Sequence, residues 1–250
     1  MSNFTNTKES NKNSCTPKSA KILLDRSGSM HALMSSLIKG TNDLLIEQKQ
    51  EAEDSGNSMH IQIYTFDTFL EKVRDGPIES IDLINADEIK ARGSTALNDS
   101  MATILDEGKD DKDVLFFIFT DGHENASIKH REDAGRMYCK SLIEKYRRDN
   151  NWTVLFGAAN IDAYQTGNAY GIPKGMAFNV DSNAPTVGNM MRAVSNSIRE
   201  SSSNGKPIDV ENIRQMSAPI KLNNNEDDNN SLPPPNFRLV RNPVIDTPDS

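Results

Sequence analysis

One seven-residue segment, Val-Leu-Phe-Phe-Ile-Phe-Thr at 114–120, limits the fold more than any other part of the chain. Side chains along a strand point alternately to its two faces, so a strand that is apolar throughout is buried on both. Strands of this kind occur inside parallel sheets that carry helices on both sides. The segment therefore predicts a mostly parallel sheet that is covered on both faces.

The rest of the pattern alternates between strand and helix, as such a fold requires. Further strands are predicted at 21–24, 60–66, 69–73, 152–159 and 176–180. Helices are predicted at 33–49, 95–108, 132–147, 162–170 and 185–199. Because only Asp67 and Thr68 separate the second and third strands, these strands predict a hairpin whose second strand is an antiparallel edge strand. The fold class is thus α/β, and its ligands are expected at the carboxyl ends of the strands, where the strand order reverses.

Composition divides the chain into three parts. Residues 1–18 are polar and aperiodic and predict a disordered N-terminal arm, and residues 19–200 carry the pattern of the folded domain. Residues 201–250 contain Ser, Asn and Pro runs and predict a low-complexity, extended C-terminal tail. Two less polar fragments in this tail, 210–216 and 237–245, leave open the alternative that it docks on neighbouring molecules by strand addition.

Charge and cysteine content exclude several classes of protein. The net charge of −8 argues against nucleic acid as a partner. No apolar run reaches the length of a membrane span, and the N-terminus has no signal-peptide pattern, so neither a membrane partner nor export is expected. Cys15 and Cys139 have no spacing of a zinc site or a disulfide framework and are expected to be free thiols. We therefore expect a cytoplasmic protein, or a virion protein if the source is viral.

Three separated segments carry oxygen-bearing side chains at the predicted carboxyl edge of the sheet. The first follows the first strand and contains Asp25, Ser27 and Ser29. The second contains Thr95 at the start of a helix, and the third contains Asp121 directly after the central strand. In an extended turn residues 25, 27 and 29 point the same way while residues 26 and 28 point elsewhere, and Gly28 permits a sharp bend. The order and placement of the segments predict one convergent site.

The chemistry of this set indicates a hard divalent cation. Carboxylate and hydroxyl oxygens, without any imidazole or thiolate, suit Mg²⁺ or Mn²⁺ rather than zinc or copper. Two carboxylates balance the charge of the ion, while hydroxyls add none. Small octahedral ions also keep water ligands. The cation is therefore expected to stay open to an acidic oxygen from outside the chain.

The pattern Asp-x-Ser-x-Ser, then Thr, then Asp resembles the metal-ion-dependent adhesion site of von Willebrand factor A domains. The resemblance covers about 19–200 and extends through 92–99, 120–125 and 155–163, where the sequence is similar to intracellular A domains of bacteria and their phages. It implies a Rossmann-like fold and metal-mediated binding of another protein, whose Glu or Asp completes the metal shell. It also implies that the five matched residues surround the ion, with the second Asp often acting through water: Asp25, Ser27, Ser29, Thr95 and Asp121.

Residues beside these five are weaker candidates for a part in the site. Asp99 lies one helical turn after Thr95 and is expected either to orient the loop or to be a carboxylate on the helix face. A second group is expected at the rim, either in contact with the partner or simply solvated: Glu124, Asn125, Asn160 and Asp162. His123 flanks the site and is expected to be an exposed loop residue.

An enzyme is the chief rival to a binding module. Asp25 could be a phosphoryl-accepting nucleophile, as in haloacid dehalogenase-like phosphatases, but those need an acidic residue two positions later, where this chain has Ser27. The sequence also has no Walker-type phosphate loop and no nucleophile elbow. We therefore expect no catalytic residues.

Two binding roles remain open. One is an accessory subunit of an AAA+ ATPase complex, and the other is a component of a large assembly such as a phage particle. The long polar ends and the phage-like branch favour the second, in which the C-terminal tail would contact assembly neighbours.

Overall fold

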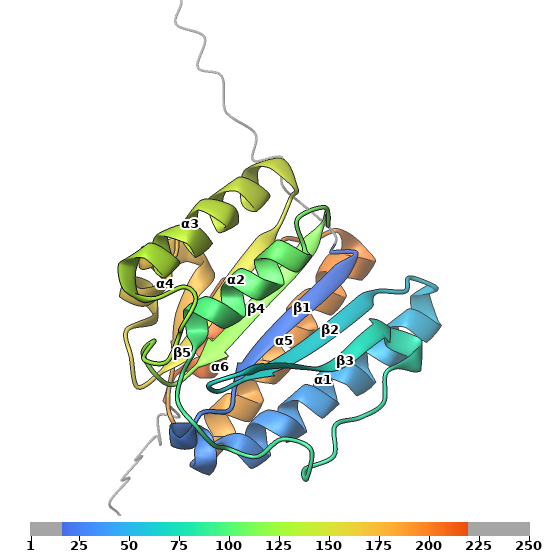
Figure 1. The fold of residues 1–250 in the computed structure, drawn as a ribbon. Coiled ribbons are helices and arrows are strands. Elements are labelled where there is room, and N and C mark those ends of the chain that lie inside the picture. The colour runs from blue at the N-terminus through green and yellow to red at the C-terminus, as the bar shows by residue number, and fades with distance from the viewer. Residues whose placement is uncertain (1–16, 220–250) are drawn as a thin grey trace, which may run out of the picture. The chain divides into compact units, whose positions relative to one another are not determined.

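The computed structural model describes residues 17–219, which form a six-stranded sheet in the order β3-β2-β1-β4-β5-β6 (Figure 1). All neighbouring strands are parallel except β2 and β3, which are antiparallel and place β3 at one edge. The strands span β1 Ser19–Asp25, β2 His60–Phe66, β3 Leu70–Pro77, β4 Val114–Thr120, β5 Thr153–Ala159 and β6 Ala177–Val180. The α/β class, the parallel sheet and the antiparallel edge strand are thereby confirmed.

Strand β4 lies between β1 and β5, and all seven of its residues are buried. Its alternate side chains enter two separate apolar cores, with Phe117 and Phe119 in one and Phe116 and Ile118 in the other. The first core also contains side chains of α1 and α5, and the second contains side chains of α2, α3 and α4. The helices therefore cover both faces of the sheet, as its apolar central strand predicts (Figure 1).

The helices and short 3₁₀ turns span η1 Gly28–Ala32, α1 Met34–Ser55, η2 Ile78–Ser80, α2 Leu97–Glu107, α3 Glu132–Asp149, α4 Ala163–Ala169, η3 Lys174–Met176, α5 Ala184–Asn204 and α6 Val210–Ser217. Helix α1 runs six residues beyond the predicted end at 49 and stops at Gly56, whose φ of 72° is left-handed. Its last turns contribute little apolar surface, since Ala52 is the buried residue among them. The apolar periodicity therefore fades before the helix ends.

The folded domain also extends past the predicted boundary at residue 200. Helix α5 continues to Asn204, and α6 occupies part of the segment that composition assigned to an extended tail. Val210 and Ile213 of α6 are buried in the core shared with α1 and α5. The predicted arm up to residue 16 and the tail from residue 220, including the fragment 237–245, lie outside the described residues.

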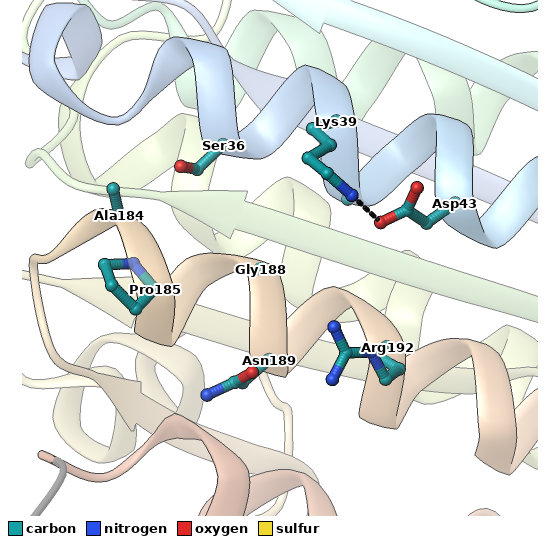
Figure 2. Close-up of a pocket in the computed structure, with 9 residues that line it drawn as sticks. Ser36, Lys39, Asp43, Ala184, Pro185, Gly188, Asn189 and Arg192 are labelled. Carbon is teal, nitrogen blue, oxygen red and sulfur yellow. Dashed lines mark hydrogen bonds and ion pairs between the residues drawn. The ribbon is translucent and has the colours of Figure 1, made fainter.

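Helices α1 and α5 pack closely where Gly40 faces Met191. A Cβ atom on Gly40 would come within 2.8 Å of the Met191 Cβ, so a larger residue would separate the two helices. Beside this contact lies a groove of about 320 Å³. Figure 2 shows that the ion pair between Lys39 and Asp43 lines it from α1 and that Arg192 lines it from α5. The groove is shallow and is formed by helix surfaces rather than by strand ends.

Two expectations about chemistry and location can be compared with the described part of the chain. Cys139 is a free thiol, buried inside α3, and burial raises its pKa to about 12. Cys15 lies outside the described residues. Among residues 17–219 no helix combines the length and apolar character that a membrane crossing requires.

Candidate metal centre

The strand order reverses between β1 and β4, and the candidate residues lie at the carboxyl ends of these two strands. Asp25 is the last residue of β1, and Asp121 directly follows β4. The two strands are neighbours in parallel register, so their ends meet at the same edge of the sheet. This is the crevice in which open α/β sheets hold their ligands.

Asp25 is fully buried, and both of its carboxylate oxygens are oriented by neighbouring groups. Oδ1 accepts a hydrogen bond of 2.6 Å from the Ser27 amide, and Oδ2 accepts one of 2.6 Å from the Thr120 hydroxyl. Thr120 ends β4, so the second bond joins the two strands at their carboxyl ends. The position of the Asp25 carboxylate is thus fixed by the sheet itself.

A row of oxygens continues from the first segment to Asp121. The Ser27 and Ser29 hydroxyl oxygens lie 3.1 Å apart, and Ser29 donates a hydrogen bond of 2.7 Å to Oδ1 of Asp121. The other oxygen of Asp121, Oδ2, is buried and has no hydrogen-bond partner among the described residues. Arg26 points away, toward Asp67, so alternate residues of this turn do point to different sides as expected.

Thr95 reaches the same place from the segment before α2. Its amide donates to Oδ1 of Asn125 at 2.8 Å, and its carbonyl accepts from the Asn125 and Ala126 amides at 3.0 and 3.2 Å. Its hydroxyl lies 3.3 Å from the position that a Cβ atom would take on Gly122, the residue after Asp121. The five predicted residues therefore gather at one edge of the sheet.

The two carboxylates of this cluster are poorly compensated in the protein alone. Burial raises the pKa of Asp25, and the nearby charge of Asp121 raises it further, although hydrogen bonds from Thr120 and Ser27 act in the opposite direction. Burial also raises the pKa of Asp121. Among the described residues, no Lys, Arg or His is a leading cause of either shift. Buried charges in proteins are normally paired or bound to a metal ion. The positive partner that this pair of acids requires is therefore still to be supplied.

The donor set fits a hard cation that takes only a few of its ligands from the protein. The described residues contain no group of three His, Cys, Asp or Glu side chains that could hold a metal. The cluster instead combines two carboxylates with hydroxyls, which suits Mg²⁺ because that ion keeps several of its waters. The free oxygen of Asp121 and the uncompensated charge are the features that a cation would satisfy.

The raised pKa of Asp121 gives a prediction for the metal-free protein. In EDTA, Asp121→Asn should gain stability relative to the wild type as the pH rises above the usual carboxyl pKa of 3.8. The folded pKa lies above the usual 3.8, so the folded state holds a proton that the unfolded state has already released. The wild type therefore loses stability as the pH rises through the folded pKa, whereas Asn does not titrate. Urea unfolding at several pH values measures this difference, and a pH-independent difference would contradict the assignment.

Three of the weaker candidates hold the loops in place. Asp99 accepts the amides of 128, 129 and 130 at 2.7, 3.1 and 2.6 Å, so it orients the segment between β4 and α3. Glu124 accepts the Asn98 amide at 2.7 Å at the start of α2, and Asn125 holds Thr95. The expectation that Glu124 and Asn125 serve as rim or solvated residues therefore misses their main contacts, which are with backbone amides.

The other weak candidates line a cavity of about 560 Å³ beside the cluster, between the loop after β4 and helix α4. His123 is exposed, as expected, and Asn160 is also exposed. Asp162 is the N-cap of α4, where its carboxylate accepts the Tyr164 and Gln165 amides. Asp162 is thus exposed but has a local structural role.

An ion-pair network centred on the buried Asp67 and Arg26 was not predicted from the sequence. Asp67 follows β2 and is buried, and its Oδ2 lies 3.0 Å from Nε of Arg26 and 2.8 Å from Nε of Arg92. Arg26 is also buried and pairs with Glu71 at 2.8 Å. Burial acts to raise the pKa of Asp67, but bonds from Arg92 and the Phe69 amide and the charge of Arg26 lower it overall. The network ties the first segment to the β2–β3 turn and to residue 92.

The strand order, the single antiparallel edge strand and the helices on both faces define a von Willebrand factor A-like fold. No protein-family model and no curated protein matches the sequence. Among solved structures, the VWA2 paralogue of ArnB from Sulfolobus acidocaldarius is 14% identical, with a TM-score of 0.50 over 72% of this chain and 46% of that one.

Two pilus proteins have a similar fold. The pilus adhesin SpaC from Lactobacillus rhamnosus GG is 13% identical, with a TM-score of 0.56 over 74% of this chain and 31% of that one. The minor pilin PilB from Streptococcus sanguinis is 11% identical, with a TM-score of 0.53 over 74% and 62%. This chain thus matches less than two thirds of each of these proteins, and at such low identity the likeness concerns the fold alone.

Proposed function

We propose that this chain is a non-catalytic module that binds one divalent cation, Mg²⁺ or Mn²⁺, and uses it to bind an acidic side chain of a partner protein. The observation that carries the proposal is the pair of buried carboxylates, Asp25 and Asp121, for which no basic residue in the described part of the chain is a leading source of compensation. A cation would supply that charge and would also satisfy the free Oδ2 of Asp121.

The five clustered residues would divide the work of holding the cation. Asp25 and Asp121 would supply negative charge, and Ser27, Ser29 and Thr95 would supply hydroxyl oxygens. When bound, the cation would accept an oxygen of the partner's Asp or Glu in place of a water. The hydrogen bonds to Asp25 and Thr95 keep this set in position without the cation, so little reorganisation is needed for binding.

A binding role accords better with the cluster than catalysis does. Ser27 stands where a phosphatase of the haloacid dehalogenase type needs an acid, and its hydroxyl oxygen lies beside that of Ser29. The named structures of similar fold include a pilus adhesin and a minor pilin, which supports a role in protein contacts. An assay with a generic phosphoester tests the alternative, since metal-dependent turnover would favour an enzyme.

Two settings for the binding role are proposed, an assembly component such as a phage particle protein and an accessory subunit of an AAA+ ATPase complex. Co-purification from the native source, followed by mass spectrometry, separates them. Capsid or tail proteins would support the assembly role, and an ATPase would support the accessory role.

Addition of Mg²⁺ to the metal-free protein should raise its stability. At a concentration of about 100 times the Kd, ligand binding stabilises a fold by about 2.7 kcal/mol. For a domain of this size that corresponds to a rise in melting temperature of roughly 5–11 °C. Thermal unfolding in EDTA and in Mg²⁺ measures the effect, with KCl of equal ionic strength as the control. Equal melting temperatures in all three conditions would contradict the proposed cation site.

A further inference from the structure

Two large apolar side chains are exposed at the same edge of the sheet as the candidate metal centre. Phe69 is 70% exposed and Ile128 is 66% exposed. Phe69 lies in the turn after β2, and Ile128 lies in the segment between β4 and α3. Single exposed apolar residues are common on protein surfaces, so what distinguishes these two is their position beside the centre and the order of the backbone that presents them.

The backbone around each of these side chains is held by a carboxylate. Asp67 accepts the Phe69 amide at 2.8 Å, and its own amide donates to the Phe69 carbonyl at 3.1 Å. Asp99 accepts the Ile128 amide at 2.7 Å, and the Ile128 carbonyl accepts Nε of Arg131 at 2.9 Å. Both apolar side chains are therefore presented from an ordered backbone, which reduces the entropy lost when a partner binds.

Phe69 and Ile128 belong to segments on opposite sides of the segment that carries Thr95. On one side the Ala96 amide donates to the Asp67 carbonyl at 2.8 Å. On the other side the Asn125 amide donates to the Thr95 carbonyl at 3.0 Å. The order along the edge is thus the Phe69 turn, the Thr95 segment and the loop of Ile128.

The exposed titratable side chains within the three segments of the centre are basic, in contrast to the net charge of the chain. The whole chain has a net charge of −8. In the three segments that carry the five oxygens, the acidic side chains are buried or hydrogen bonded to the backbone or to Ser, and the exposed titratable ones are basic: His31, Arg92, His123, Lys129 and Arg131. Exposed acids lie on the neighbouring elements, at Glu71 in β3, at Asp162 before α4 and at Glu132 and Asp133 where α3 begins. The basic side chains of the three segments are therefore the charges that an acidic partner would meet at the centre.

We propose that the partner presents a linear acidic segment in which an Asp or Glu is flanked on both sides by apolar residues. The acid would meet the candidate cation, and the apolar residues would pack on Phe69 and Ile128. An aromatic side chain on a fixed backbone is the kind of residue that anchors an interface. The acidic part of this inference rests on the proposed function, and the apolar part rests on the placement of Phe69 and Ile128.

Selection from a random-peptide display library on the full chain in Mg²⁺ tests the proposal. The variants are Phe69→Ser and Ile128→Ser, and the matched control is Ile46→Ser, because Ile46 is 51% exposed on the outer surface of α1. Peptides recovered on the wild type should combine an acid with apolar residues on both sides. A recovered peptide should bind each of the two edge variants about tenfold more weakly than the wild type or the control.

Distinct outcomes would overturn the two parts separately. Recovered peptides with acids but no apolar flanks, equal affinity for all four proteins, or no enrichment of any peptide would each overturn the inference. If EDTA leaves peptide affinity unchanged while Phe69→Ser and Ile128→Ser still weaken it, the proposed cation function fails and the apolar surface stands.

Discussion

The Asp25→Asn variant should bind Mg²⁺ on the order of a hundredfold more weakly than the wild type, if it binds the ion measurably at all. The substitution removes one of the two negative charges of the candidate centre and keeps the shape of the side chain. The remaining donors would be one carboxylate and neutral hydroxyls, which hold Mg²⁺ weakly in water. Isothermal titration of the metal-free proteins with MgCl₂ measures the affinity directly.

The fold of this variant should persist, which separates loss of the site from loss of structure. Asn removes a buried charge whose pKa is raised by burial, so unfolding in EDTA should not become easier by much. Asp43→Asn is a matched control, because Asp43 makes an exposed ion pair with Lys39 on α1. An unchanged affinity of Asp25→Asn for Mg²⁺ would place any cation site elsewhere.

The Asp67→Ala variant should lose about 3–5 kcal/mol of unfolding free energy. Asp67 is the shared acceptor of two arginines, and one of them, Arg26, is as deeply buried as Asp67 itself. Removal of the carboxylate leaves the Arg26 charge inside the protein, and among residues 17–219 its remaining ion-pair partner is the exposed Glu71. Urea unfolding monitored by circular dichroism measures the loss.

A second substitution identifies the cause of this loss. Arg26→Met in the Asp67→Ala background should restore part of the stability, because it removes the unpaired buried charge. Asp75→Ala is a suitable control, since Asp75 makes partly exposed ion pairs with His60 and Lys72, and such pairs contribute about 1 kcal/mol or less. A loss below about 1 kcal/mol for Asp67→Ala would show that the network contributes little.

The strands were predictable because each carries its own pattern. The apolar run of β4 and the alternation of β2 appear within single segments, and the tight Asp67-Thr68 connection fixes the hairpin. Helix α6 was missed because it is only eight residues long and follows the polar run 200–206. Val210 and Ile213 are too few to give a helical period, and it is packing on α5 and β6 that makes them part of the core.

The candidate centre was predictable to the extent that its residues form a motif. The five oxygen-bearing residues occur at strand ends and a helix start, positions that the sequence reveals. The residues that hold them act over long separations, as Arg26 and Asp67 do across 41 positions. Asp67 lies in a turn, where Asp is a common residue, so its sequence position does not reveal its role. Glu124 and Asn125 accept backbone amides from distant segments, and no local pattern marks such contacts.

The placement of α6 also limits how copies of this domain could associate. Arg214 of α6 donates from Nη2 to the Ala177 carbonyl at 3.2 Å, and the helix packs along β6, so this border of the sheet is capped. At the opposite border, β3 carries several charged residues and ends at Pro77, which discourages backbone pairing between molecules. Any oligomer of this domain should therefore be built from side-chain contacts, with each sheet remaining at its own six strands.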